Sequence, residues 1–122
     1  MKLFSNLESY AHKIAVIEQN EKIYTYKDIL KIEKKISDFI KKKDKIFLFC
    51  ENTFDFISLY VSLLRLNSVI FLIEETINSE NLKKLIKNFE PNYIFATKNK
   101  VFNNYKKLFL KDNNYNFYKT NY

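Results

Sequence analysis

Residues 46–97 read IFLFCENTFDFISLYVSLLRLNSVIFLIEETINSENLKKLIKNFEPNYIFAT, in which three apolar runs alternate with two helical segments. The first run, Ile46 to Cys50, is continuously apolar, a pattern typical of a strand buried on both faces. Val69 to Ile73 and Tyr93 to Thr97 have the same character. Short strands joined by helices form parallel sheets through right-handed crossovers. We therefore expect an α/β fold, a mainly parallel sheet with flanking helices.

The two segments between these strands have helical spacing. Thr53 to Leu66 is apolar almost all round, so it must be covered by protein on most sides, and we expect a chain of 122 residues to leave part of it uncovered. Asn52 is its expected N-cap. The second helix follows Ser79, and the Glu90-Pro91 pair closes it, because the residue before Pro avoids the helical conformation. One stripe of this second helix is apolar, with Leu82, Leu85, Ile86 and Phe89.

Toward the N-terminus the sequence predicts a short helix, a hairpin and a longer helix. The short helix rests on the spacing of Leu3, Leu7, Tyr10, Ala11 and Ile14. The apolar runs 15–17 and 23–24 flank a polar turn and indicate a hairpin. Thr25 and Asp28 have the spacing of a capping box. The helix that they open ends at the lysine run 41–43, whose cations would complement the helix dipole.

The sequence predicts two parts, an α/β subdomain of residues 1–98 and a basic aromatic tail of residues 99–122. The spacing of Val101, Phe102, Tyr105, Leu108 and Phe109 predicts one more helix. The tail holds five lysines and one aspartate, +4 of the chain's net charge of +7. Its aromatic residues are able to stack on single-stranded nucleic acid, but we favour their packing against protein outside this chain. They are Phe102, Tyr105, Phe109, Tyr115, Phe117 and Tyr118.

The chain contains no glycine, and this excludes several sites. A loop that cradles phosphate needs backbone N–H groups close to the anion, at φ values that only glycine adopts cheaply. The sequence therefore contains no Walker A loop, no dinucleotide-binding fingerprint and no nucleophile elbow, since each of these motifs requires glycine.

Five side chains are candidates for chemistry, each with a plainer alternative. His12 is the one histidine, and a surface position on a helix is favoured over a general base. Cys50 is either a nucleophile or, as we favour, a small core residue at a strand end. Glu51, Glu74 and Glu75 follow strand carboxyl ends, where open α/β sheets bind ligands. We favour solvated carboxylates beside the helices over a metal site at these three positions.

Several segments, in order, resemble one family. The opening of the chain is similar to that of the adenylate-forming ligases, which include acyl-CoA synthetases, amino-acid adenylation domains and beetle luciferases. The similar residues are Ala15-Val16-Ile17, followed by Thr25-Tyr26-x-x-Ile29-Leu30. The stretch 44–53 resembles their aspartate, strand and Asn-Ser segment. The stretch 63–69 resembles the turn in which they carry glycine, with Asn67 at that position. We expect Asn67 to support this turn, because Asn tolerates the left-handed conformation better than other residues do. Pro91 to Phe95 completes a resemblance that covers residues 10–98.

This resemblance implies a parent enzyme that uses ATP and Mg²⁺ to activate a carboxylic acid as an acyl-adenylate. The catalytic residues of such ligases lie downstream of the matching region, so no catalytic, cofactor-binding or metal residue is assigned here. We expect an inactive scaffold whose partner is the rest of a ligase or a second copy. A stand-alone regulatory domain and a small nucleic-acid-binding module are the alternatives. The lone Cys50 and the lack of a signal peptide or membrane span predict a cytoplasmic protein.

Overall fold

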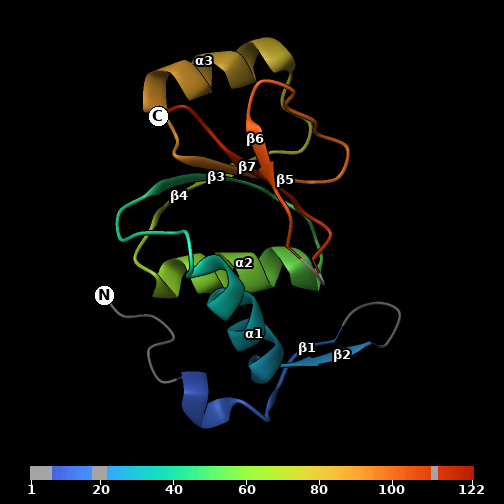
Figure 1. Cartoon of the computed structure of the whole chain (residues 1–122). Helices are drawn as coiled ribbons and strands as arrows, with labels where there is room; N and C mark the ends of the chain where they lie inside the picture. Colours follow the sequence, from blue (N-terminus) through green and yellow to red (C-terminus); the bar gives the residue numbers. More distant parts are fainter. Residues whose placement is uncertain (1–6, 18–21, 111–112) are drawn as a thin grey trace. The chain divides into compact units, whose positions relative to one another are not determined.

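The three strands predicted between Ile46 and Thr97 form the parallel part of a five-stranded sheet in the computed structural model, which describes residues 7–17, 22–110 and 113–122. They are β3 (Lys45–Phe49), β4 (Val69–Ile73) and β5 (Tyr93–Ala96), and β3 lies between the other two (Figure 1). Phe47 of β3 is in register with Phe71 of β4 and Ile94 of β5. The predicted α/β fold is confirmed.

The tail adds two antiparallel strands to the same sheet. They are β6 (Lys106–Leu108) and β7 (Asn116–Lys119), and the strand order is β4-β3-β5-β7-β6. The predicted helix over residues 101–109 is therefore wrong. β7 pairs with β5 on one side, and β6 satisfies the backbone groups on its other side. This long-range pairing outweighs the local helical spacing, which is a weak preference.

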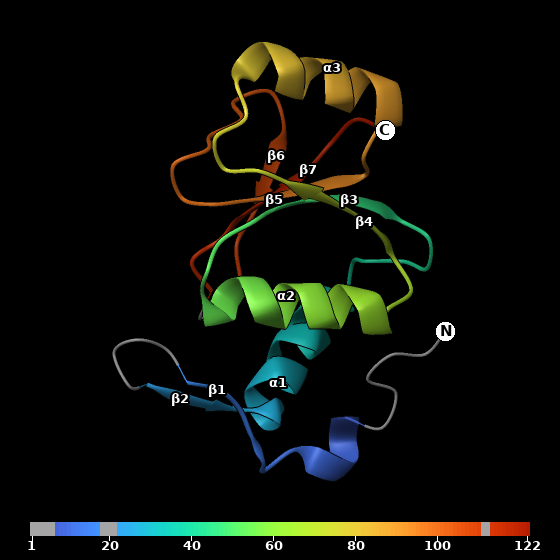
Figure 2. The same ribbon diagram turned by 180° about the vertical axis from the view of Figure 1, so that it is seen from behind.

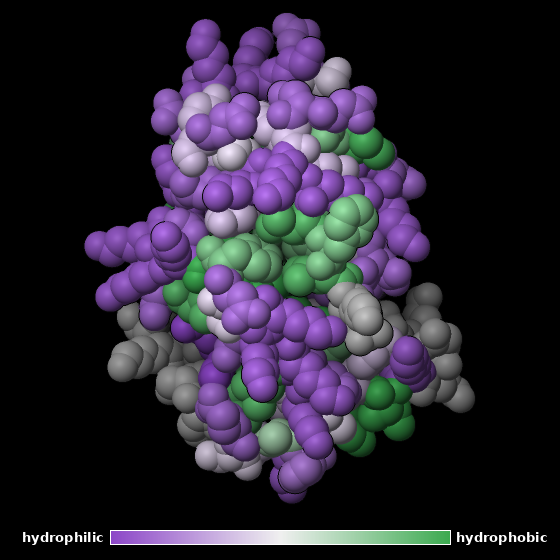
Figure 3. Space-filling model, in the orientation of Figure 1, coloured by the Kyte–Doolittle hydropathy of each residue, from purple (hydrophilic) through white to green (hydrophobic). Residues whose placement is uncertain are grey.

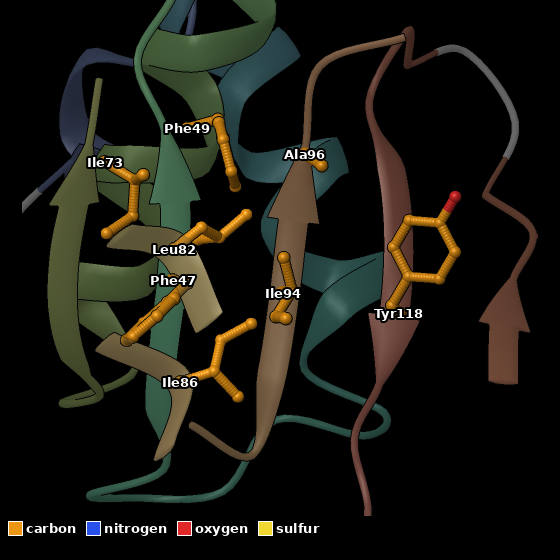
Figure 4. Packing of buried hydrophobic residues seen from close by; sticks show 8 residues of the cluster. All are labelled: Phe47, Phe49, Ile73, Leu82, Ile86, Ile94, Ala96 and Tyr118. Carbon is orange, nitrogen blue, oxygen red and sulfur yellow. The ribbon is translucent and has the colours of Figure 1, made fainter. Parts of the chain in front are cut away.

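One face of the sheet is covered by α3 (Ser79–Phe89), as Figures 1 and 2 both show. Leu82 and Ile86 point from this helix onto the strands (Figure 4). Asn78 caps α3 by accepting a hydrogen bond from the Asn81 N–H at 2.8 Å. The residues buried together beneath α3 come from four strands: Phe47, Phe49, Ile73, Ile94, Ala96 and Tyr118.

The opposite face of the sheet is also apolar and buried, through Ile46, Leu48, Phe95 and Phe117. The edge strand β4 differs from the fully buried strand that its sequence predicted. Val69 is 42% exposed and Leu72 is 51% exposed, while Ile73 alone in β4 is buried. An edge strand has a neighbour on one side only, so its side chains are less completely covered. Figure 3 shows apolar side chains in patches between larger hydrophilic areas.

The chain divides into two compact units, and the sheet with α3 belongs to the second one, Lys43–Glu51 with Val69–Tyr122. The first unit, Met1–Lys42 with Asn52–Ser68, holds the remaining elements. These are the 3₁₀-helix η1 (Leu7–Tyr10), the antiparallel strands β1 (Ile14–Ile17) and β2 (Ile23–Thr25), and the helices α1 (Tyr26–Ile36) and α2 (Phe54–Arg65). The predicted hairpin is confirmed, and its turn, residues 18–21, lies outside the described residues, as does Leu3.

In this first unit, helices α1 and α2 share a small apolar core. Leu7, Ile29, Phe54 and Val61 are buried together, and the ring of Phe54 stacks on Tyr24 with centroids 3.8 Å apart. In the described structure every residue of α2 is buried or half-buried, and the half-buried apolar residues Phe56, Ile57, Tyr60 and Leu64 keep part of their surface uncovered.

The structure confirms the predicted capping box of α1 and corrects two other predictions about helix ends. The Thr25 N–H donates to the Asp28 carboxylate at 2.8 Å, so the capping box of α1 is present. α2 is capped by Thr53, whose hydroxyl accepts from the Phe56 N–H at 3.3 Å, and not by Asn52. α1 ends at Ile36, so the lysine run 41–43 lies beyond it. The last turn of α1 carries Lys34 and Lys35 instead.

Arg65, at the end of α2, joins three elements of the first unit. Its guanidinium forms ion pairs with Glu33 of α1 and with Glu8 of η1. The Arg65 side chain is 11% exposed, the Glu33 side chain 19% and the Glu8 side chain 61%. Two of the three charged groups are therefore largely removed from water.

Asn67 stands at the turn where the resembled family carries glycine, and it adopts the left-handed conformation with φ 59°. The N–H of Asn67 donates to Leu64, and that of Ser68 donates to Leu63, at 3.1 and 3.2 Å. These two bonds form a Schellman motif, which satisfies carbonyl groups at the end of α2. The expectation that Asn supports this turn is confirmed.

Substitutions at Asn67 test this turn. We expect Asn67→Val to lower the free energy of unfolding by about 1–2 kcal/mol, because a β-branched residue clashes in the left-handed region. Asn67→Gly is expected to leave the stability unchanged or to raise it by a few tenths of a kcal/mol. Urea denaturation of the two variants measures both effects. Equal stability of the Val and Gly variants would contradict the assigned conformation.

Candidate functional site

The carboxyl ends of the parallel strands bring several of the candidate side chains to one edge of the sheet. The Thr97 hydroxyl, after β5, donates to the Glu75 carboxylate, after β4. Tyr115 donates its hydroxyl proton to the carbonyl oxygen of Phe49 at 2.5 Å, at the end of β3. Glu75 and Phe49 are thus held by neighbouring segments, and this edge is cross-linked by hydrogen bonds.

Cys50 lies at the same edge and is half-buried. Burial raises the pKa of its thiol, and the nearby Glu74 carboxylate raises it further. A raised thiol pKa lowers the fraction of nucleophilic thiolate at neutral pH. Among the described residues, no three His, Cys, Asp or Glu side chains are grouped so as to hold a metal ion. In the described chain, neither observation supports an activated thiol or a metal site at this edge.

His12, the other candidate for acid–base chemistry, lies in the turn before β1 and is exposed. It belongs to the first unit, whereas Cys50 and the glutamates 51, 74 and 75 are in the second. Among the described residues, no hydrogen-bond partner orients its imidazole as a base. The predicted surface position is confirmed, but His12 lies in a turn and not on a helix.

The loop after β5 is fastened at two points. The Asn116 side-chain amide donates to the carbonyl oxygens of Lys98 and Lys100, at 3.4 and 3.3 Å. The Lys100 ammonium lies over the ring of Phe49, 5.8 Å from its centroid. These contacts hold the first part of the loop against β7 and β3, and so they fix one wall of the groove described next.

A groove of about 740 Å³ lies between α3 and this loop, within the second unit. One wall consists of the α3 residues Ser79, Leu82, Lys83, Ile86 and Lys87, and the other of residues 99–105, with Ile77 and Tyr122 at the ends. Sequence reasoning did not find this groove. Lys83 and Lys87 are one helical turn apart, a signal that places both on one face, but the opposite wall depends on how the loop folds.

The tail aromatics pack within the chain, where the sequence had favoured packing against protein outside it. Phe117 contacts Phe95 edge to face, with ring centroids 4.7 Å apart, and Phe102 contacts Tyr118 in the same manner at 5.2 Å. Tyr115, Phe117 and Tyr118 are buried. Of the six tail aromatics named above, only Phe109 is exposed, at 86%. The described tail therefore presents no row of open rings for stacking on bases.

By sequence, no family model and no curated protein matches this chain. Solved structures match its fold. MatB from Rhodopseudomonas palustris superposes with a TM-score of 0.69 and 16% identity over 80% of this chain and 21% of MatB. The N-terminal subdomain of Klebsiella oxytoca NpsA gives 0.61 and 11% over 75% of this chain and 25% of that chain. The luciferase-like enzyme of the mealworm Zophobas morio gives 0.63 and 20%, over 81% and 26% respectively.

These neighbours are adenylate-forming enzymes, so the fold is that of the N-terminal subdomain of adenylate-forming ligases. The chain spans about a quarter of the length of the structures that it matches. MatB has been solved with ATP bound, and the N-terminal subdomain of NpsA in complex with anthranilyl-AMSN. Within the residues that the structure describes, no helix has the length and apolar character needed to cross a membrane.

Proposed function

We propose that this chain is the N-terminal part of an AMP-forming ligase that activates a carboxylic acid as an acyl-adenylate with ATP and Mg²⁺. The observation that carries the proposal is the fold match to MatB over 80% of this chain. In this proposal the chain is a scaffold in the cytoplasm, and the chemistry belongs to the rest of the ligase. The rest of the ligase, or a second copy, is its partner.

The side chains of this chain support a scaffolding role. The transition state of adenylation places negative charge on the α-phosphate, and preorganised donors and a metal ion must neutralise it. A glycine-free chain lacks the backbone cradle that would supply such donors. The described acidic residues do not group into a Mg²⁺ site, and Glu75 already accepts a hydrogen bond from Thr97. These residues do not fit ATP and Mg²⁺, and we derive no catalytic step through them.

The exposed apolar residues of the second unit are suited to contact with further protein. Val69 and Leu72 of the edge strand β4, and Phe89 at the end of α3, are each more than 40% exposed. Phe89 lies beside Phe71 of β4, with ring centroids 4.9 Å apart, so part of this surface is continuous. An edge strand with exposed apolar side chains is a site where another chain pairs or packs.

Two measurements with the chain itself test this proposal. We expect isothermal titration of Mg-ATP into the chain to show no binding, and ATP–pyrophosphate exchange with a panel of fatty, aromatic and amino acids to show no activity. A polypeptide in which this chain is continuous with the rest of its ligase is expected to catalyse the exchange. Exchange catalysed by the 122-residue chain alone would overturn the assignment of the chemistry to other residues.

A further inference from the structure

We propose that the groove between α3 and residues 99–105 is a docking site for a protein partner, which binds through a segment rich in Asp and Glu with interspersed apolar side chains. This goes beyond the scaffolding role, because it adds an interaction surface on the side of the sheet that α3 covers. The proposal rests on the charge of the groove, on the character of its floor and on its size.

The charged side chains that line the groove are positive. Lys83 and Lys87 line it from α3 and Lys100 from the loop, and among the described residues no Asp or Glu side chain lines it; Tyr122 brings the terminal carboxylate to one end. In the described chain neither Lys83 nor Lys87 takes part in an ion pair, whereas Lys84 between them pairs with Glu80 at 3.7 Å outside the groove. Complementary charge steers a partner toward such a surface and excludes partners of like charge.

The floor of the groove is apolar. Leu82 and Ile86 keep 7% and 8% of their surface open to solvent, and Ile77 and Phe102 beside them are half-buried. A floor of aliphatic side chains with small open areas suits the insertion of another apolar side chain. It does not suit the stacking of bases, because stacking needs an open ring face and Phe102 is packed edge to face on Tyr118. These features favour a protein segment over nucleic acid.

The size of the groove and the polar side chains at its rim also suit a peptide segment. A volume of about 740 Å³ accommodates one or two inserted side chains with the backbone between them. Asn99, Asn103 and Asn104 line the loop side, and their amides both donate and accept hydrogen bonds, as a peptide backbone requires. The Tyr105 hydroxyl also lines the groove and is a further hydrogen-bonding group there.

The direct test is fluorescence polarisation with a short fluorescein-labelled peptide of Glu and Asp interrupted by Leu and Phe. Two control peptides carry Lys in place of the acidic residues or Ala in place of the apolar ones, and a labelled single-stranded oligonucleotide is the third control. The double variant Lys83→Glu/Lys87→Glu reverses the groove charges. Its matched control, Lys84→Glu/Lys31→Glu, makes the same change of net charge at exposed positions outside the groove.

We expect the acidic apolar peptide to bind, and the groove variant to weaken this binding about ten-fold or more, since two attractive contacts become repulsive. The matched control is expected to change it less than about three-fold, and both control peptides should bind more weakly. Amide NMR shifts of residues 79–87 and 99–105 should move most. A chain extended beyond Tyr122, which displaces the terminal carboxylate, should bind at least as well.

Three results would overturn the proposal. The first is no binding of the acidic apolar peptide. The second is an equal loss of binding in the groove variant and in its matched control, which would place the contact elsewhere. The third is preferential, strongly salt-dependent binding of the oligonucleotide, which would identify nucleic acid as the occupant.

Discussion

Phe47→Ala is expected to lower the free energy of unfolding by about 3–5 kcal/mol, the usual cost of removing a fully buried phenylalanine from a core. Phe47 is at 0% exposure in the central part of the sheet, and its ring meets that of Phe71 edge to face at 5.6 Å. Figure 4 shows it beneath Leu82 and Ile86 of α3. Domains of this size have about 5–15 kcal/mol of stability in total, so the variant is expected to be partly unfolded at 37 °C.

The matched control for this variant is Phe109→Ala, because Phe109 is 86% exposed just after β6. We expect this substitution to change the free energy of unfolding by less than about 0.5 kcal/mol. Urea denaturation followed by circular dichroism measures both variants. A Phe47→Ala protein as stable as the Phe109→Ala protein would contradict the assigned core.

Arg65→Met is expected to be the next most damaging substitution, at about 2 kcal/mol. Met preserves the apolar stem of the side chain but leaves the Glu33 carboxylate, which is 19% exposed, without its cationic partner. The figure is below that for a fully buried ion pair because solvent still reaches the cluster. Lys84→Met removes one half of an exposed ion pair with Glu80 and is the control, with an expected change below about 0.5 kcal/mol.

The cluster also gives a direction for the dependence on pH. The pKa of the Glu8 carboxyl is lowered from its ordinary value, first by a backbone hydrogen bond and then by the Arg65 guanidinium. A carboxyl whose pKa is lower in the folded than in the unfolded state stabilises the fold above the unfolded value, and the effect is lost as the pH falls through the folded value. The difference between wild type and Arg65→Met should therefore shrink below about pH 4. A difference that grows in acid would contradict this assignment.

The parallel sheet was predictable because each of its strands is a short apolar run between helices with a clear amphipathic stripe. Residues 46–50, 69–73 and 93–97 are signals of this kind, and the structure places each strand within one residue of them at either end. β6 and β7 were not predictable, because the pairing of residues 116–119 with β5 is a contact across about twenty residues. The aromatic spacing of 102, 105 and 109 fits a helix locally, and only the open side of β5 makes a strand the better solution.

The candidate site was predictable only in part. Parallel strands end at the same edge of a sheet, so the position of Glu75 at that edge was predictable. The hydrogen bonds from Thr97 to Glu75 and from the Tyr115 hydroxyl to the Phe49 carbonyl oxygen were not, because each joins segments that are distant in the sequence. The groove beside α3 depends on the same folding, since residues 99–105 form one of its walls. Side chains that converge from distant segments leave no local pattern in the sequence.

The most direct test of the account is the size and composition of the native polypeptide that carries this sequence. Immunoprecipitation from native cells with an antibody against the chain, followed by gel electrophoresis and mass spectrometry, measures both. We expect a ligase several times the 14.8 kDa of this chain, either as one polypeptide or as a stable complex with a larger adenylate-forming protein. A free 14.8 kDa protein without any adenylate-forming partner would contradict it and leave a stand-alone interaction domain.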